Sequence, residues 1–356
     1  MDTTPSEQDP KAPPTDLIEQ LNNQKRKVDF DTFDITVKQL ISMVEDKLID
    51  IAPEYQRQFR WKQDRQSVLI ESVLLGIPLP SLFMAANKDG TWELVDGVQR
   101  LSTLIRFAGS EELRKRLSVG DPLVLESLNK LSTFNSLSFQ NLPPPIQIQF
   151  QLKPIKIITL SDKSDLQVRF DLFERLNTGG VALTDQEIRA CIFRGPFINL
   201  LEELAQDPDF RTVVHVPQHK FHDGTLEEYV LRFFAFLYNY KIFEHSVVGF
   251  LNEYTAQASI QFDAEKNRSI FKKTFKQLAT IFPNGIKRSQ STTPVNLYEA
   301  IAVGAGLVVQ AGGKLTATKN PKWVGSTDLR HYTTGATNSR KQVASRIEYC
   351  AKQLSK

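Results

Sequence analysis

The segment Asp96-Gly97-Val98-Gln99-Arg100 places the strongest constraint on the fold of this chain. Residues 91–95, Thr-Trp-Glu-Leu-Val, have the composition of a short strand. From Leu101 to Ala108, apolar residues recur at the spacing of one helix face. The sequence therefore predicts a strand that turns at a glycine directly into a helix.

Such a corner is chemically suited to a phosphate group. The first turn of a helix has free backbone N–H groups and the positive end of the helix dipole. Gln99 and Arg100 add side-chain donors, and Asp96 adds a carboxylate that can hold a proton or a metal ion. A tight turn without a ligand explains the same glycine equally well, so the corner alone leaves both interpretations open.

Three further motifs accompany this corner in a fixed order. Residues 53–61 read Pro-Glu-Tyr-Gln-Arg-Gln-Phe-Arg-Trp, residues 76–80 read Gly-Ile-Pro-Leu-Pro, and residues 173–180 read Phe-Glu-Arg-Leu-Asn-Thr-Gly-Gly. Together they resemble the N-terminal domain of GmrSD-type restriction systems, which belongs to the ParB/sulfiredoxin-like superfamily. The resemblance covers about residues 35 to 195. It departs at Val98, where the family most often carries a second glutamine, and this weakens any role for that missing amide.

The resemblance implies that the segment 53–61, called the early loop below, lines one pocket together with the corner. In that pocket Gln56 and Arg57 would meet Asp96, Gln99 and Arg100. Cations interleaved with aromatic rings suit a nucleotide or a single nucleic-acid strand, but the rings can also simply plug the core. We expect Phe59 and Trp61 to pack. The expected catalytic residues are Arg57, Asp96 and Arg100. The expected nucleotide-binding residues are Tyr55, Gln56, Gly97, Gln99, Asn177 and Thr178. Asp96 is expected to hold Mg²⁺. The two glycines after Thr178 can belong to the binding site, or they can simply end the preceding helix.

The charge of the chain is unevenly distributed. Residues 251–356 hold 16 Lys and Arg against 6 Asp and Glu, whereas residues 1–250 hold 28 against 35. A basic last third suggests a polyanion such as DNA, although a solvated surface or an acidic protein partner has the same signature. We expect Arg340, Lys341 and Arg346, near the start of a last helix, to contact nucleic acid.

The order of patterns predicts an α+β protein with three parts. Residues 1–27 are polar and proline-rich and are expected to form a flexible tail. Residues 28–195 are expected to form a ParB/sulfiredoxin-like mixed α/β domain. Residues 196–356 are expected to form a basic α-helical domain, with helices at about 225–243, 263–282, 294–311 and 339–354. Capping boxes are expected at Thr184–Glu187 and Thr225–Glu228.

Several classes of protein are disfavoured by the sequence. Two cysteines give neither a disulfide framework nor a zinc pattern, and no apolar run is long enough to cross a membrane. We therefore expect a cytoplasmic protein without membrane contact. His215, His219 and His222 are expected to lie in a surface loop, because Pro217 would break a helix that aligned them. No pattern of histidines fits the HNH nuclease domain that GmrSD-type systems often carry.

Three functions remain open. The first is a module of a bacterial restriction and anti-phage defence system that binds and hydrolyses a nucleoside triphosphate with Mg²⁺, acting with DNA and a separate nuclease or second GmrSD-like chain. The second is a DNA-binding adaptor or regulator that uses the same pocket without turnover. The third is a nuclease, which the shortage of carboxylates disfavours.

Overall fold

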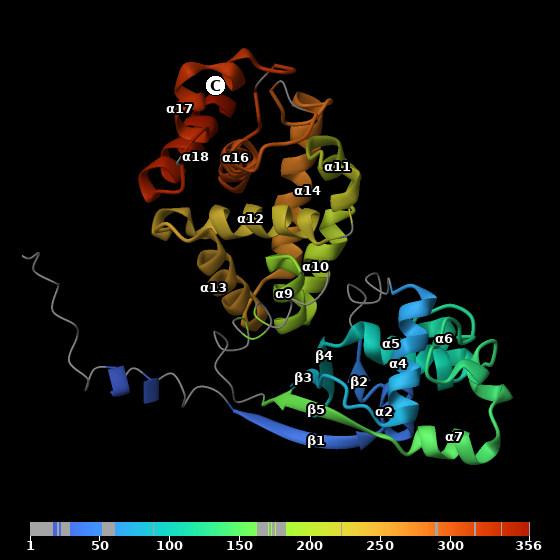
Figure 1. The fold of residues 1–356 in the computed structure, drawn as a ribbon. Coiled ribbons are helices and arrows are strands. Elements are labelled where there is room, and N and C mark those ends of the chain that lie inside the picture. Colours follow the sequence, from blue (N-terminus) through green and yellow to red (C-terminus); the bar gives the residue numbers. More distant parts are fainter. Residues whose placement is uncertain are drawn as a thin grey trace, which may run out of the picture. The chain divides into compact units, whose positions relative to one another are not determined.

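The computed structural model of the protein describes residues 17–19, 21–22, 29–51, 61–87, 89–161, 170, 172, 175, 183–221, 223–288, 291–316, 318–335 and 337–355. The chain forms two compact units, Met1–Ala182 and Leu183–Lys356 (Figure 1). The first unit is mixed α/β and the second is helical, which confirms the α+β fold class. Most of the expected tail, residues 1–27, lies outside the described residues.

The division between the units falls thirteen residues before the expected boundary at 195. Helix α9 (Asp185–Ile192) packs on helices α12 (Thr225–Asn239) and α13 (Val247–Ile260). These residues therefore belong to the helical unit. The expected capping box opens α9: the Thr184 N–H donates to Glu187 Oε2 at 2.7 Å, and the Glu187 N–H donates to Thr184 Oγ1 at 3.2 Å.

A five-stranded mixed sheet lies at the centre of the first unit. Its strands are β1 (Phe30–Thr36), β2 (Ile49–Asp50), β3 (Leu82–Ala86), β4 (Trp92–Asp96) and β5 (Pro154–Leu160). Their order across the sheet is β1-β5-β3-β4-β2. Strand β4 runs antiparallel to β3 and parallel to β2, and β5 runs antiparallel to β1 and parallel to β3. Leu82, Met84, Leu94 and Ile157 are fully or almost fully buried, so the core lies along the central strands.

Helices connect and cover these strands, and most of them pack on one another (Figure 1). They are α2 (Val37–Glu45), α4 (Gln63–Leu75), α5 (Val98–Ala108), α6 (Glu111–Arg116) and α7 (Pro144–Gln151), with 3-10 turns η1 (Ser132–Phe134) and η2 (Phe139–Asn141). Three consecutive prolines, Pro143–Pro145, stand at the start of α7, with Pro143 as its N-cap. Proline suits a first helical turn, because its fixed φ is helical and its missing N–H has no partner there.

The second unit consists of helices around an aromatic core. They are α9, α10 (Pro196–Ala205), α11 (Pro208–Val213), η4 (Gln218–Lys220), α12, η5 (Tyr240–Ile242), α13, α14 (Ala264–Ile281), α15 (Val295–Tyr298), the π-helix η6 (Glu299–Val303), α16 (Gly304–Gln310), η7 (Lys322–Gly325), α17 (Thr327–Thr333) and α18 (Arg340–Leu354). Phe233, Phe271 and Phe275 lie at the centre with ring centroids 4.3–5.5 Å apart. The capping box expected at Thr225 does not form, since α12 begins after Gly224.

A π-helical turn interrupts the helix expected at 294–311. It begins at Glu299, and the chain returns to α-helix at Gly304. A Cβ added at Gly304 would lie 2.8 Å from the Ala351 nitrogen of α18. Glycine is therefore required there, because it lets α16 approach α18 at backbone distance.

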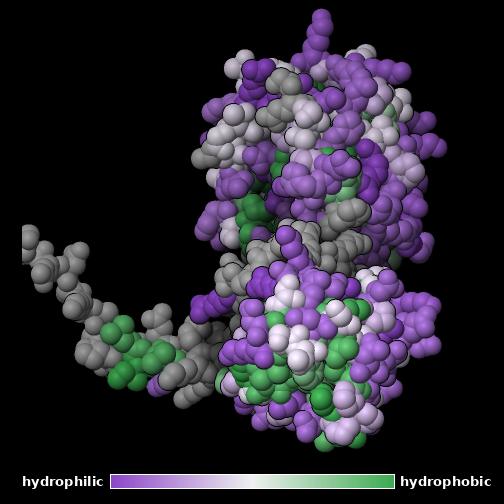
Figure 2. All heavy atoms as spheres, turned by 45° about the vertical axis from the view of Figure 1, so that its right-hand side comes forward, coloured by the Kyte–Doolittle hydropathy of each residue, from purple (hydrophilic) through white to green (hydrophobic). Residues whose placement is uncertain are grey.

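The two units differ in surface character. Figure 2 shows apolar side chains gathered on part of the visible face of the first unit. The exposed large apolar residues of this unit include Ile148 of α7 and Leu152 directly after it. The visible face of the second unit is mainly hydrophilic. Among the described residues, no helix is both long and apolar enough to span a bilayer.

Candidate functional site: the strand–glycine–helix corner

The corner expected from the sequence is present. Strand β4 ends at Asp96, and α5 begins at Val98 with Gly97 as its N-cap. Gly97 has φ +107°, and a Cβ there would lie 2.3 Å from Leu82 Cδ2. Only glycine fits both the left-handed backbone and this contact with β3. Gly97 is therefore the residue that turns the strand into the helix.

Among the described residues, no side chain caps the amino end of α5 by a hydrogen bond. Residues before the fourth position of a helix have no intrahelical acceptor for their N–H groups, and these groups carry the positive end of the dipole. The Leu101 N–H, at the fourth position of α5, donates to Gly97 O at 2.9 Å. An anion placed over this first turn would meet donors and a favourable dipole.

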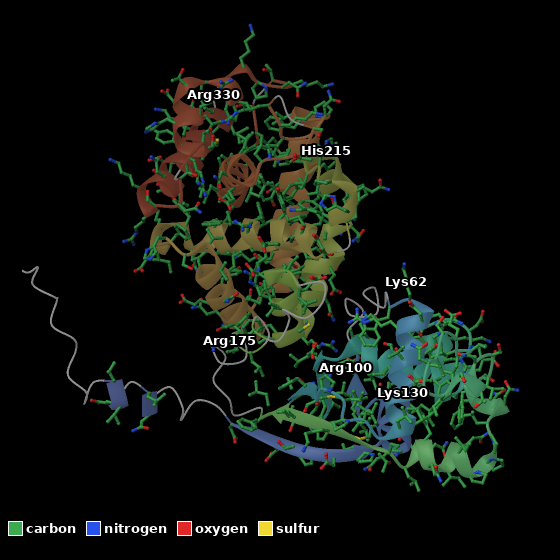
Figure 3. All side chains as sticks on the ribbon, viewed as in Figure 1. Lys62, Arg100, Lys130, Arg175, His215 and Arg330 are labelled. Carbon is green, nitrogen blue, oxygen red and sulfur yellow. The ribbon has the colours of Figure 1, made fainter. Side chains whose placement is uncertain are left out.

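Arg100 forms an ion pair with Asp96 rather than standing free at the corner. Its Nη2 lies 2.5 Å from Asp96 Oδ2, and its side chain is 13% exposed against 34% for Asp96. Its Nη1 donates to Ser81 O at 2.9 Å and also to Pro80 O. Figure 3 shows Arg100 within the first unit. Arg100 thus fixes the orientation of Asp96 and joins the corner to the turn that contains the Gly-Ile-Pro-Leu-Pro motif.

Gln99 anchors the end of the early loop. Its Oε1 accepts from the Trp61 N–H at 3.0 Å. The Trp61 carbonyl accepts from Gln66 Nε2 at 2.6 Å, and Gln66 Oε1 accepts from Arg106 Nη1 at 2.9 Å. Both backbone groups of Trp61 are therefore held by α4 and α5. Gln99 has a positioning contact that the sequence did not indicate.

The early loop begins and ends close to the corner. Tyr55, Gln56 and Arg57 lie outside the described residues, as do Asn177 and Thr178. The chain enters this loop from β2, which runs parallel to β4, so both strands point toward the same edge of the sheet. It returns at Trp61, bonded to the first turn of α5. The meeting of Arg57 with Asp96 remains a prediction.

The corner offers one carboxylate for a metal ion. No group of three or more metal-ligating side chains occurs anywhere in the described part of the chain. A single carboxylate oxygen is nevertheless compatible with Mg²⁺, which commonly takes one or two carboxylates together with phosphate oxygens and water. Asp96 therefore fits Mg²⁺ as the companion of a polyphosphate rather than as a closed protein site.

The three residues predicted to contact nucleic acid differ in their exposure. Arg346 is wrong for this role: it is 0% exposed, and its guanidinium donates to Thr337 O at 3.0 Å and pairs with Glu299. It faces the core because it follows Val343 by three residues on the buried side of α18. Arg340 and Lys341 are exposed, and Arg340 Nε donates to Lys241 O at 2.5 Å.

Arg346 belongs to a buried ionic network that the sequence did not reveal. The network runs from Arg189 through Glu228, Arg232 and Glu299 to Arg346, with N–O distances of 3.0 Å for Arg189–Glu228 and 2.6 Å for Arg232–Glu299. Burial alone would raise the pKa of Glu228, but Arg232 and Arg189 outweigh it and hold that pKa below its ordinary value. Only the Glu228–Arg232 pair, four residues apart on α12, has a sequence signal.

The histidines do not form a metal site among the described residues. The His215 N–H donates to Thr293 Oγ1 at 2.9 Å, and its ring packs against Gly285. His219 lies in the 3-10 turn η4, and His222 lies outside the described residues.

These features define a class: a mixed α/β unit whose strand–glycine–helix corner is suited to an anion, followed by a helical unit. Comparison with known families supports the resemblance seen in the motifs. Residues 37–194 match the family described as the GmrSD restriction endonuclease, N-terminal domain. The match contains the corner, the Gly-Ile-Pro-Leu-Pro turn and helix α9, and it covers fewer than half of the 356 residues. No curated protein matches the chain significantly.

Proposed function

We propose that this protein is a nucleotide-binding and nucleotide-hydrolysing module of a bacterial restriction and anti-phage defence system. It would work in the cytoplasm with DNA and with a separate nuclease or a second GmrSD-like chain. The observation that carries the proposal is the strand–glycine–helix corner, where the amino end of α5 lies beside Asp96 within the region that matches a restriction-endonuclease domain.

Each polar group at the corner would have its own role in binding and hydrolysing the nucleotide. The backbone N–H groups of the first turn of α5 would donate to phosphate oxygens, because these donors and a favourable dipole are in place before the ligand arrives. Asp96 would hold Mg²⁺ against the phosphates or orient the attacking water. Arg100 would keep Asp96 in position through their ion pair. Arg57 would bring further positive charge to the phosphates from the early loop.

One observation favours the regulator as a second candidate. Arg100 has its Nη1 and Nη2 committed to Asp96 and to two carbonyl groups. A guanidinium held in this way is less available to stabilise the charge that develops in phosphoryl transfer. In that case the corner would bind a nucleotide and report its presence to a partner without hydrolysing it.

Calorimetry and phosphate release with the four ribonucleoside triphosphates and Mg²⁺ test the proposal. Asp96→Asn keeps the size of the side chain and is expected to abolish turnover. Asp31→Asn is the matched control, because Asp31 is an exposed carboxylate on β1, separated from β4 by two strands. Binding without phosphate release by the wild type would select the regulator, and no binding of any triphosphate would refute both candidates.

A further inference from the structure

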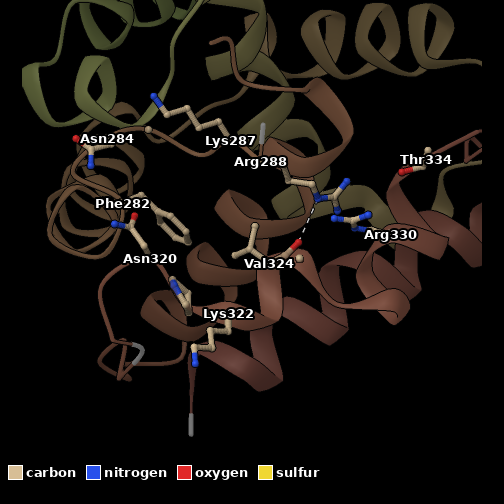
Figure 4. A pocket seen from close by; sticks show the side chains of 12 residues that line it. Phe282, Asn284, Lys287, Arg288, Asn320, Lys322, Val324, Arg330 and Thr334 are labelled. Carbon is tan, nitrogen blue, oxygen red and sulfur yellow. Dashed lines mark hydrogen bonds between the residues drawn. The ribbon is translucent and has the colours of Figure 1, made fainter. Parts of the chain in front are cut away.

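A basic pocket in the second unit is not explained by the proposed nucleotide site. It has a volume of about 760 Å³, within the range of about 300–1,000 Å³ typical of ligand pockets. Its walls come from the loop after α14, the turn η7 and helix α17 (Figure 4). Four cationic residues line it: Lys287, Arg288, Lys322 and Arg330.

No carboxylate balances these charges in the described part of the chain. The lining residues include no Asp or Glu, and none of the four cations has an ion pair there. Asp328 lies two residues before Arg330 on α17, a spacing at which side chains do not face each other. Like charges gathered without a counter-charge are unfavourable, so this arrangement fits a pocket completed by an anion.

Two hydrogen bonds hold the Arg288 side chain in place, and its other N–H groups remain available to a ligand. Its Nε donates to Val324 O at 3.1 Å and its Nη2 donates to Thr333 Oγ1 at 2.8 Å. A guanidinium has five N–H donors, so three are left without an acceptor among the described residues. Burial and the neighbouring Arg330 both lower the pKa of Arg288, and Figure 4 shows the two guanidinium groups next to each other. Two such groups form a fork suited to phosphate oxygens.

The loop that carries Lys287 and Arg288 is also fixed. Gly285 has φ +85° with the His215 ring packed against it, and the Asn320 N–H donates to Ile281 O at 2.9 Å. These contacts anchor the floor of the pocket to the rest of the unit, while Lys322 and Arg330 are exposed at its surface.

We propose that this basic pocket is a phosphate-binding site that holds the backbone of DNA. Arg288 and Arg330 would contact one phosphate, and Lys287 and Lys322 would neutralise its neighbours. DNA, rather than a free phosphate compound, is favoured because residues 251–356 carry a net charge of +10 well beyond the four pocket residues. The proposal rests on the proposed function only in taking DNA as the partner. It places the DNA contact at this pocket instead of at Arg346.

Fluorescence anisotropy with a labelled DNA duplex at several salt concentrations tests the site. The variant Lys322→Ala with Arg330→Ala removes two exposed charges. The control Lys266→Ala with Lys273→Ala removes two exposed charges from α14 that do not line the pocket. Circular dichroism checks that both variants keep the wild-type helix content.

Loss of two phosphate contacts should flatten the log–log salt slope by about 1.8 and weaken binding about tenfold at low salt. The control should change each much less, and a scrambled duplex should bind equally well, because phosphate contacts carry no sequence information. Equal effects of the two variants would overturn the pocket while leaving DNA binding in place. Absence of DNA binding by the wild type would overturn the pocket together with the DNA part of the proposed function.

A second arm separates the two sources of phosphate. Inorganic triphosphate is titrated into the wild type and both variants by calorimetry. The variant Asp96→Asn is included to account for triphosphate that binds at the strand–glycine–helix corner. Triphosphate binding that only the pocket variant loses, without DNA binding, would mean that the pocket takes free phosphate compounds and would refute DNA as its ligand.

Discussion

Replacing Glu299 by Gln tests the buried ionic network of the second unit. Glu299 is 1% exposed and pairs with Arg232 at 2.6 Å and with Arg346, which is 0% exposed. Glutamine keeps the shape but not the charge. The network would then hold three arginines against the single carboxylate of Glu228.

The magnitude follows from the burial of the groups left behind. Removing one partner of a buried pair costs about 3–5 kcal/mol, because the remaining charge stays desolvated. We expect Glu299→Gln to lower the free energy of unfolding of the second unit by about 3 kcal/mol or more. Urea denaturation followed by circular dichroism at 222 nm measures this, since the regular elements described in the second unit are all helices.

A surface pair supplies the matched control. Glu265 also pairs with an arginine, Arg268, but is 87% exposed. Exposed pairs contribute roughly 0–1 kcal/mol, so Glu265→Gln should change stability little. Adding Arg346→Met to Glu299→Gln removes the orphaned charge and should restore part of the loss. A cost for Glu299→Gln no larger than that of Glu265→Gln would refute the reasoning.

Three further predictions concern other described residues. Gly97→Ala should destabilise the first unit by about 2 kcal/mol or more, measured by thermal unfolding, because the new Cβ meets Leu82 and the backbone has φ +107°; an unchanged Tm would contradict the corner geometry. Glu228, whose pKa is lowered in the fold by Arg232 and Arg189 acting against burial, contributes stability above its unfolded pKa of about 4.3 that is lost as pH falls below it. Denaturation midpoints should therefore decrease from pH 5 to pH 3, and less so in Glu228→Gln. Cys191 and Cys350 are buried, and burial raises the pKa of Cys350, so neither thiol should react with Ellman's reagent until the protein unfolds; rapid labelling of the native protein would contradict this.

Local patterns in the sequence predicted the elements that depend on near neighbours. The β4–Gly97–α5 corner, the capping box at Thr184 and the last helix depend on glycine conformation, short-range hydrogen bonds and apolar spacing. Each involves residues at most a few positions apart. The family resemblance over residues 37–194 is likewise visible in ordered motifs.

Contacts between distant residues were decided only by the tertiary structure. A guanidinium looks the same in sequence whether it faces a ligand or the core, and packing alone paired Arg346 with Glu299, 47 residues away. Packing likewise turned Arg100 toward the carbonyls of residues 80 and 81, and brought Lys322 and Arg330 to the loop that carries Arg288. The sequence by itself determined the corner and the positive charge of the last third. The fold decided which of those charges are neutralised in the core and which gather in one pocket, because long-range packing selects the neighbours of each side chain.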